Sequence, residues 1–179
     1  MNYAEMVREF HERFGHPIDA ELTMAQRAFR CRLIVEEWAE YEAALEARNR
    51  CAIAHELGDL LYVIVGTGVS MGEPIGILCS KVRGEFDRGA LYAAISDVGS
   101  GPNWMAKDSL RRVASNVACL FRFHAIPLDD VFAEIHRSNM TKTPNGTEKP
   151  GKGDGYSPPD IAGILARHDA AVADPDEEC

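Results

Sequence analysis

Two successive segments of the chain, 24–47 and 50–71, combine apolar residues at helical spacing with a set of acidic residues. In the first segment the apolar residues that recur along one helix face are Phe29, Leu33, Trp38, Tyr41 and Leu45. Thr23 and Gln26 form the pattern of a capping box that would open this helix, and Asn49 can cap the next one. The sequence therefore predicts two long helices joined by a short turn.

Helical patterns continue on both sides of these two segments. Further helices are expected over 3–14, 75–95, 106–124, 127–140 and 160–173, separated by segments rich in Gly and Pro such as 99–102 and 143–159. Convincing strand alternation is absent. The expected fold is therefore all-α, with a four-helix-bundle-like core and no sheet.

Five carboxylates lie within the apolar stripes of the two long helices. They are Glu36, Glu37, Glu40, Glu56 and Asp59. At about 100° per residue the first three share an arc with Leu33 and Ala44, and the last two, spaced i and i+3, share a face. Burial of an unpaired carboxylate is costly, and Arg32, which can pair with Glu36, cannot neutralise five acids. Packed side by side, the two helices would form an oxygen-lined cage for a hard divalent cation.

The number of acids points to more than one ion. Magnesium usually takes only one or two protein carboxylates per ion, and water and phosphate oxygens complete its shell. Five acids therefore favour two or more Mg²⁺ ions in the presence of substrate, with Mn²⁺ as a substitute. A ferritin-like di-iron site is disfavoured, because none of the six histidines has a Glu three positions before it. The alternative is a pair of acidic helix faces in water, without a metal.

Composition narrows the partners and the compartment. The formal net charge of −9 argues against a nucleic-acid-binding module, which would show a basic face. The most apolar run, 60–69, is too short to span a bilayer, so no membrane partner is expected. The five cysteines are widely spaced, odd in number and never arranged as CxxC, which favours reduced thiols and no zinc site. With a charged N-terminus, these features predict a cytoplasmic protein.

Several segments together resemble one known superfamily. EEWAE (36–40) followed by ELGDLLYV (56–63) resembles the EExxE…ExxD signature of the all-α NTP pyrophosphohydrolases, which include the MazG-like proteins, the phosphoribosyl-ATP pyrophosphohydrolases and the dimeric dUTPases. FHERFGHP (10–17) is similar to the first segment of MazG-like proteins. HRSNMTK (136–142) and KGDGYSPPD (152–160) are similar to the phosphoribosyl-ATP pyrophosphohydrolase-like branch. The resemblance implies hydrolysis of a nucleoside triphosphate to the monophosphate and diphosphate.

The resemblance also implies residue roles. Glu36, Glu37, Glu40, Glu56 and Asp59 would bind the metal, and Glu36 or Glu37 would position or deprotonate the attacking water. The candidate substrate-binding residues are Asn139, Lys142, Arg137, Lys152, Tyr156, His11 and Phe14. Asn139 and Lys142 fall on positions expected to contact phosphates, and His11 and Phe14 can stack on a base. Without the resemblance, the first pair indicates a helix C-cap and a solvated terminus, and the second a helix–turn contact.

One region departs from the resemblance. Residues 75–125 separate the ELGDLLYV helix from the HRSNMTK helix, so we expect a helical insertion in a catalytic bundle spanning 1–142. Residues 143–179 are expected to form a Gly/Pro/Lys-rich loop and a C-terminal tail, disordered from Asp174 to Cys179. Glycines 66, 68 and 72 are candidates for close helix approach.

Three functions remain open. The first is a MazG-like (d)NTP pyrophosphohydrolase, with a purine deoxynucleotide such as dGTP as the substrate. The second is phosphoribosyl-ATP pyrophosphohydrolase, and the third is a non-catalytic helical oligomerisation module. A homodimer or homotetramer is expected in each case, because helices that carry buried acids need covering partners.

Overall fold

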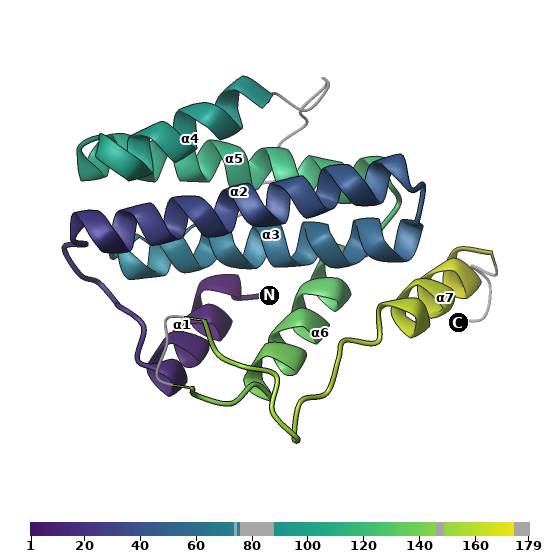
Figure 1. Cartoon of the computed structure of the whole chain (residues 1–179). Coiled ribbons are helices and arrows are strands. Elements are labelled where there is room, and N and C mark those ends of the chain that lie inside the picture. The colour runs from purple at the N-terminus through teal and green to yellow at the C-terminus, as the bar shows by residue number, and fades with distance from the viewer. Residues whose placement is uncertain (74, 76–87, 146–148, 174–179) are drawn as a thin grey trace.

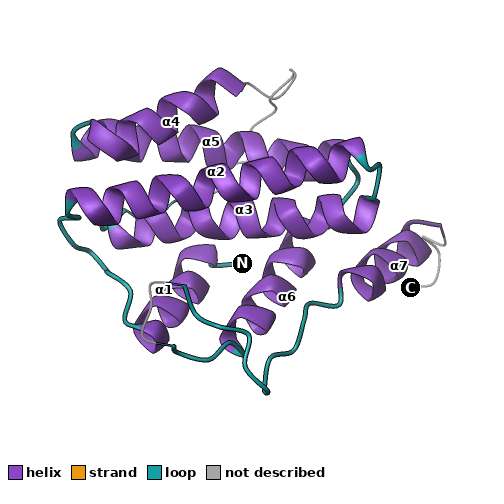
Figure 2. Cartoon of the chain, viewed as in Figure 1, coloured by secondary structure: helices purple, strands orange, loops and turns teal. Residues whose placement is uncertain are grey.

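The computed structural model describes residues 1–73, 75, 88–145 and 149–173 of the chain. These residues contain seven helices (Figure 1). They are α1 (Tyr3–Phe14), α2 (Met24–Glu46), α3 (Arg50–Ser70), α4 (Arg88–Ser100), α5 (Asn103–Phe123), α6 (Leu128–Met140) and α7 (Ile161–Ala173). Figure 2 shows no strand in the described ranges, where one isolated bridge joins Thr143 and Gly151. The all-α prediction is confirmed.

Local capping fixes the ends of the two long helices. Thr23 Oγ1 accepts a hydrogen bond from the Gln26 amide at 3.3 Å, and Gln26 Oε1 accepts one from the Thr23 amide at 2.9 Å, so the predicted capping box is present. The Asn49 side chain accepts from the Ala52 amide at 3.2 Å and caps α3 as expected.

The end of α4 differs from the prediction. Residues 99 and 100, expected in a loop, belong to α4, and α5 begins at Asn103 rather than at 106. The guanidinium of Arg27 on α2 donates to the carbonyls of Val98 and Gly101 at 3.0 and 3.2 Å, and so satisfies backbone groups at the helix end. This tertiary contact is invisible to a local reading of the Gly-rich segment. The helix expected over 75–95 does not begin at 75, because that residue is described and is not helical, and the helix observed in this region is Arg88–Ser100. Residues 76–87, and the expected disorder over 174–179, fall outside the described residues.

Four helices close into a bundle within one chain. α2 contacts α3 and α4, and α5 contacts α3 and α4, so each of the four packs against two neighbours. Each contributes fully buried apolar side chains to the core, such as Ile34, Leu61, Leu91 and Leu110. The described part of the 75–125 region, the α4–α5 hairpin, therefore packs back against α2 and α3.

On the other side of the bundle, α1 and α6 contact α3 and each other (Figure 1). Glycines of α3 allow this close packing. A Cβ at Gly66 would lie 3.1 Å from His11 Nε2 on α1, and a Cβ at Gly58 would lie 2.8 Å from Ile135 Cγ1 on α6. The expectation of close approach is thus met at Gly66. By length and composition alone, α3 could cross a membrane. However, 72% of its most apolar 18-residue stretch is buried inside the protein, which is typical of a central core helix.

Candidate active site

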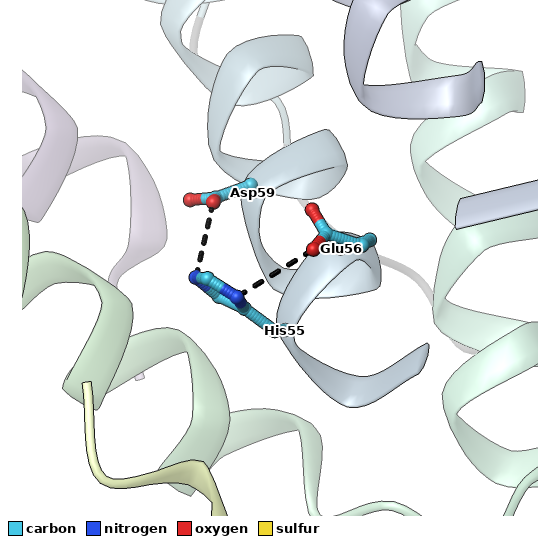
Figure 3. Close-up of side chains that lie close together, drawn as sticks. All are labelled: His55, Glu56 and Asp59. Carbon is cyan, nitrogen blue, oxygen red and sulfur yellow. Dashed lines mark ion pairs between the residues drawn. The ribbon is translucent and has the colours of Figure 1, made fainter. Parts of the chain in front are cut away.

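Acidic side chains of α2 and α3 meet between the two helices. Glu37, Glu40 and Glu56 each offer one carboxylate oxygen, and these three oxygens lie within 4.8 Å of one another. A second group with the same spacing shares Glu56 and adds Asp59 and His55. In Figure 3, the His55 ring lies beside both carboxylates, with Nδ1 3.6 Å from Glu56 Oε1 and Nε2 3.4 Å from Asp59 Oδ2. Four of the five predicted acids therefore lie close together; we call them the acid cluster.

Glu36 lies outside the acid cluster. Its side chain is exposed, and Oε1 forms an ion pair with Lys149 Nζ at 2.6 Å. Successive residues differ by about 100° around a helix, so α2 turns Glu36 toward solvent when it turns Glu37 inward. Arg32, the expected partner of Glu36, instead lies over the ring of Phe29, with its guanidinium carbon 5.7 Å from the ring centroid.

Burial and mutual repulsion raise the pKa values of three carboxyls of the acid cluster, those of Glu37, Glu56 and Asp59. Burial, then the charges of Asp59 and Glu40, raise the pKa of Glu37 to about 8. Burial and the same two neighbours raise the pKa of Glu56 to about 7. Burial also raises the pKa of Asp59, against the opposing charges of His55 and Lys142. In the metal-free protein, these three carboxyls therefore hold protons closer to neutral pH than ordinary carboxyls do.

The acid cluster borders a cavity between α1, α2, α3 and α6. Its charged end is lined by Glu37, Asp59, Asn139, Lys142 and Lys149, and its aromatic end by Phe10, His11, His16, Phe29 and Arg30. A second cavity of about 420 Å³ adjoins the aromatic end; the two share His16, Phe29, Arg30 and Pro150, and the second adds Phe14. A cavity of this size lies within the range of small-molecule pockets. Charged and aromatic ends together suit a ligand that is anionic at one end and flat at the other.

The predicted phosphate-binding residues enter the charged end from α6 and the segment that follows it. Asn139 is buried, and both Asn139 and Lys142 line the cavity. Burial lowers the pKa of Lys142, and the charges of Asp59 and Glu37 oppose this shift. Tyr62 also lines this end, and its hydroxyl lies 3.0 Å from His136 Nδ1. The Lys142 amide donates to the Asn139 carbonyl at 3.1 Å in the turn that follows α6.

The other predicted substrate residues are divided between this site and elsewhere. His11 is buried in the aromatic end, and Phe14 lines the adjoining cavity. Lys152 is exposed and lies 5.2 Å from the ring centroid of Tyr156, and its charge acts on Glu56 and Asp59.

Arg137 does not line either of these two cavities. It pairs with Glu134 at 2.7 Å and donates to the Pro158 carbonyl at 2.9 Å. Its contacts therefore tie the chain after residue 156 to α6.

Sequence reasoning missed several residues of the site. Arg30 precedes Glu37 by seven residues, which puts both on one face of α2, so the helical pattern could have revealed it. His55 could have been found as the residue four before Asp59. Lys149 carried no local signal for its ion pair, since it lies 113 residues from Glu36.

The metal-free protein is expected to lose stability as the pH rises from 6.5 to 8. The pKa values of Glu37 and Glu56 lie above the ordinary 4.5, so the folded protein keeps protons here that the unfolded chain has released. Ionisation of Glu37 alone should lower the free energy of unfolding by about 2 kcal/mol between pH 6.5 and 8, which corresponds to a fall of roughly 4–8 °C in Tm. Calorimetry in EDTA at half-unit pH steps measures the change.

Below pH 6.5 the slope should flatten. The pKa of His11 is about 3 and that of His16 about 4, so the unfolded chain takes up protons on these imidazoles that the folded protein refuses. This contribution lowers stability as the pH falls and so opposes that of the acids. A Tm that stays constant or rises between pH 6.5 and 8 without metal would contradict the raised pKa values of Glu37 and Glu56.

One comparison with known proteins gave a match. Residues 7–84 match the family model of phosphoribosyl-ATP pyrophosphohydrolase. The match includes all five predicted acids and the aromatic end of the cavity, and it ends before α5, α6 and the segment that carries Lys142 and Lys149. Comparisons with curated proteins and with solved structures gave no match.

Proposed function

We propose that this chain hydrolyses a nucleoside triphosphate to the monophosphate and diphosphate with magnesium. Through residues 7–84 the chain belongs to the phosphoribosyl-ATP pyrophosphohydrolase family of the all-α NTP pyrophosphohydrolases. The family makes the chain a nucleotide pyrophosphohydrolase, a hydrolase that acts on acid anhydrides. The proposal rests mainly on the acid cluster at the charged end of a cavity whose other end is aromatic.

The donor set of the acid cluster fits a hard divalent cation. Glu37, Glu40 and Glu56 offer carboxylate oxygens within 4.8 Å of one another, and oxygen ligands are those that Mg²⁺ prefers. Asp59 would complete the set, and two or more ions are proposed with the substrate, with Mn²⁺ as a substitute. Bound magnesium would neutralise phosphate charge and lower the pKa of a water molecule.

The protein side chains divide the remaining work. Glu37 is better supported than Glu36 as the group that positions or deprotonates the attacking water, because it lines the cavity and Glu36 is paired with Lys149 in solvent. Lys142 and Asn139 lie where they could stabilise charge that develops on the leaving diphosphate. The aromatic end would bind the nucleoside.

Two substrate classes remain candidates. A purine (d)NTP such as dGTP would place its phosphates at the charged end, in a cavity of about 100 Å³, and its base toward the adjoining cavity of about 420 Å³. Phosphoribosyl-ATP is favoured by the family match, and the adjoining cavity of about 420 Å³ offers space for an additional sugar phosphate. The non-catalytic alternative is an oligomerisation module that binds magnesium without turnover.

A substrate panel separates these candidates. Eight common NTPs and dNTPs and phosphoribosyl-ATP are each incubated with the full chain, and released diphosphate is measured through added inorganic pyrophosphatase, with Mg²⁺ and with EDTA. We expect Mg²⁺-dependent release from at least one nucleotide. Release from phosphoribosyl-ATP alone would select the second class, and no release from any compound would reject the enzyme proposal.

A homodimer or homotetramer is proposed as the assembly. Large apolar side chains stay exposed on the α4–α5 hairpin, namely Tyr92, Trp104 and Phe123, and a second copy could cover them. Within the acid cluster, Glu37 is buried, Glu56 and Asp59 are half-buried and Glu40 is exposed. A light-scattering mass equal to one 19.7 kDa chain would contradict the assembly without affecting the site.

A further inference from the structure

Arg30 holds a position that the proposed chemistry does not use. The residue is 6% exposed, and it lines both cavities at the place where they adjoin. It stands seven residues, or two helical turns, before Glu37 on the same face of α2. Two turns of helix separate the Cα atoms of the two residues by about 10.5 Å along the axis, and the guanidinium lies beside His11 at the aromatic end.

Neighbouring residues fix the orientation of this guanidinium. His11 Nδ1 lies 2.9 Å from the Pro17 carbonyl, so Nδ1 carries the proton and Nε2 can accept from Arg30 Nη2 at 3.5 Å. The absence of a side chain at Gly66 leaves room for both groups, since a Cβ there would lie 3.1 Å from His11 Nε2 and 3.7 Å from Arg30 Nη1. Helix packing thus positions Arg30 against the cavity wall.

The surroundings of Arg30 suit a flat, uncharged ring. Burial and the charge of Arg30 lower the pKa of His11 to about 3 and that of His16 to about 4, so both imidazoles are neutral at physiological pH. The rings of Phe10 and His16 stack with centroids 5.5 Å apart, and Phe29 completes the aromatic wall. Lys142, the lysine that interacts electrostatically with Asp59 and Glu37, lines the charged end of the cavity.

We propose that Arg30 recognises the base of the substrate by donating hydrogen bonds to the O6 and N7 acceptors of a 6-oxopurine nucleotide. Guanine and hypoxanthine nucleotides are then the preferred substrate class. A guanidinium has five N–H donors and no acceptor, and its bidentate pairing with O6 and N7 is the commonest specific arginine–base contact. Adenine presents an amino donor in place of O6 and would leave a buried donor facing a donor. The inference rests on the proposed function, in which the charged end binds the phosphates.

Product binding tests the inference without relying on turnover. Dissociation constants of the full chain with Mg²⁺ are measured by calorimetry for dGMP, dIMP, 7-deaza-dGMP and dAMP. We expect dGMP and dIMP to bind alike, and dAMP to bind roughly ten- to hundredfold more weakly. The 7-deaza analogue, which keeps O6 and lacks N7, should fall between them. These four measurements use the unaltered protein and therefore hold even if a variant fails to fold.

Variants then assign the selectivity to Arg30. Arg30→Gln is expected to bring the affinity for dGMP down to that for dAMP and to leave dAMP binding nearly unchanged. Arg32→Gln is the matched control on the same helix, since Arg32 is exposed and lines neither cavity, and it should keep the preference.

Five results would overturn the inference. Equal affinity of the unaltered chain for dGMP and dAMP, or no binding of any monophosphate, removes the base preference. If Arg30→Gln weakens the binding of all four ligands equally, the guanidinium binds a phosphate and not the base. Rapid hydrolysis of phosphoribosyl-ATP that depends on Arg30 would lead to the same conclusion. Hydrolysis of nucleotides without base preference would reject base recognition by Arg30 and leave the proposed function intact. Selective binding of 6-oxopurine nucleotides without hydrolysis would reject the proposed function and leave base recognition by Arg30 intact.

Discussion

Glu37→Gln is expected to lower kcat by roughly 10³-fold and at the same time to raise the Tm of the metal-free protein at pH 8. The activity loss follows from removing a carboxylate that faces both the acid cluster and the cavity. The stability gain follows because glutamine has nearly the same shape and no charge. It avoids the cost of burial and the repulsion from Asp59 and Glu40 that raise the pKa of Glu37 to about 8.

The two opposite changes are measured on the same sample. Diphosphate release gives kcat, calorimetry in EDTA gives Tm, and titration calorimetry gives the Mg²⁺ affinity, which should fall. Glu46→Gln is the matched control, because Glu46 lies exposed in the last turn of the same helix; it should change none of the three quantities. Full turnover in Glu37→Gln, or a loss of stability, would contradict the assigned role of the acid cluster.

The sequence was sufficient for the parts of the site that depend on local geometry. Capping by Thr23 and Asn49 fixed the helix starts, and the spacing of three residues placed Glu37 with Glu40 on one face of α2 and Glu56 with Asp59 on one face of α3. These relations follow from helix geometry alone, so they are correct whatever the rest of the chain does.

The rotation of α2 about its axis could not be predicted in the same way. Glu36 and Glu37 are about 100° apart, and the sequence did not say which of them faces inward. That choice depends on the packing of α4 and α3 against α2, which buries Ile34 completely and leaves Glu36 in solvent beside Lys149. The partner of Glu36 comes from a distant segment for the same reason.

The role of the α4–α5 hairpin also lay beyond sequence reasoning. An insertion between α3 and α6 could have projected into solvent or displaced the site. The hairpin instead closes the bundle on α2 and α3, while α1 and α6 occupy the side of α3 that bears the cavity. The Gly-rich end of α4 is helical because Arg27 binds its carbonyls across the bundle, a contact between residues more than 70 positions apart.

Lys142→Met is expected to lower kcat by roughly 10²- to 10³-fold while leaving the Mg²⁺ affinity unchanged or tighter. Lys142 lines the charged end of the cavity and interacts electrostatically with Asp59 and Glu37. Its removal would take away a positive charge that stabilises the leaving diphosphate, and the same removal would reduce repulsion toward bound cations. This pattern is the opposite of the one expected for Glu37→Gln, in which metal affinity and turnover fall together.

The comparison of the two variants separates phosphate binding from metal binding. Titration calorimetry with Mg²⁺ alone gives the metal affinity, and diphosphate release with saturating nucleotide gives kcat. Lys107→Met is the control, because Lys107 pairs with Glu73 at 3.3 Å and does not line the cavity; its kcat should match that of the unaltered chain. A Lys142→Met protein that loses Mg²⁺ affinity along with turnover would show that Lys142 supports the acid cluster rather than the substrate phosphates.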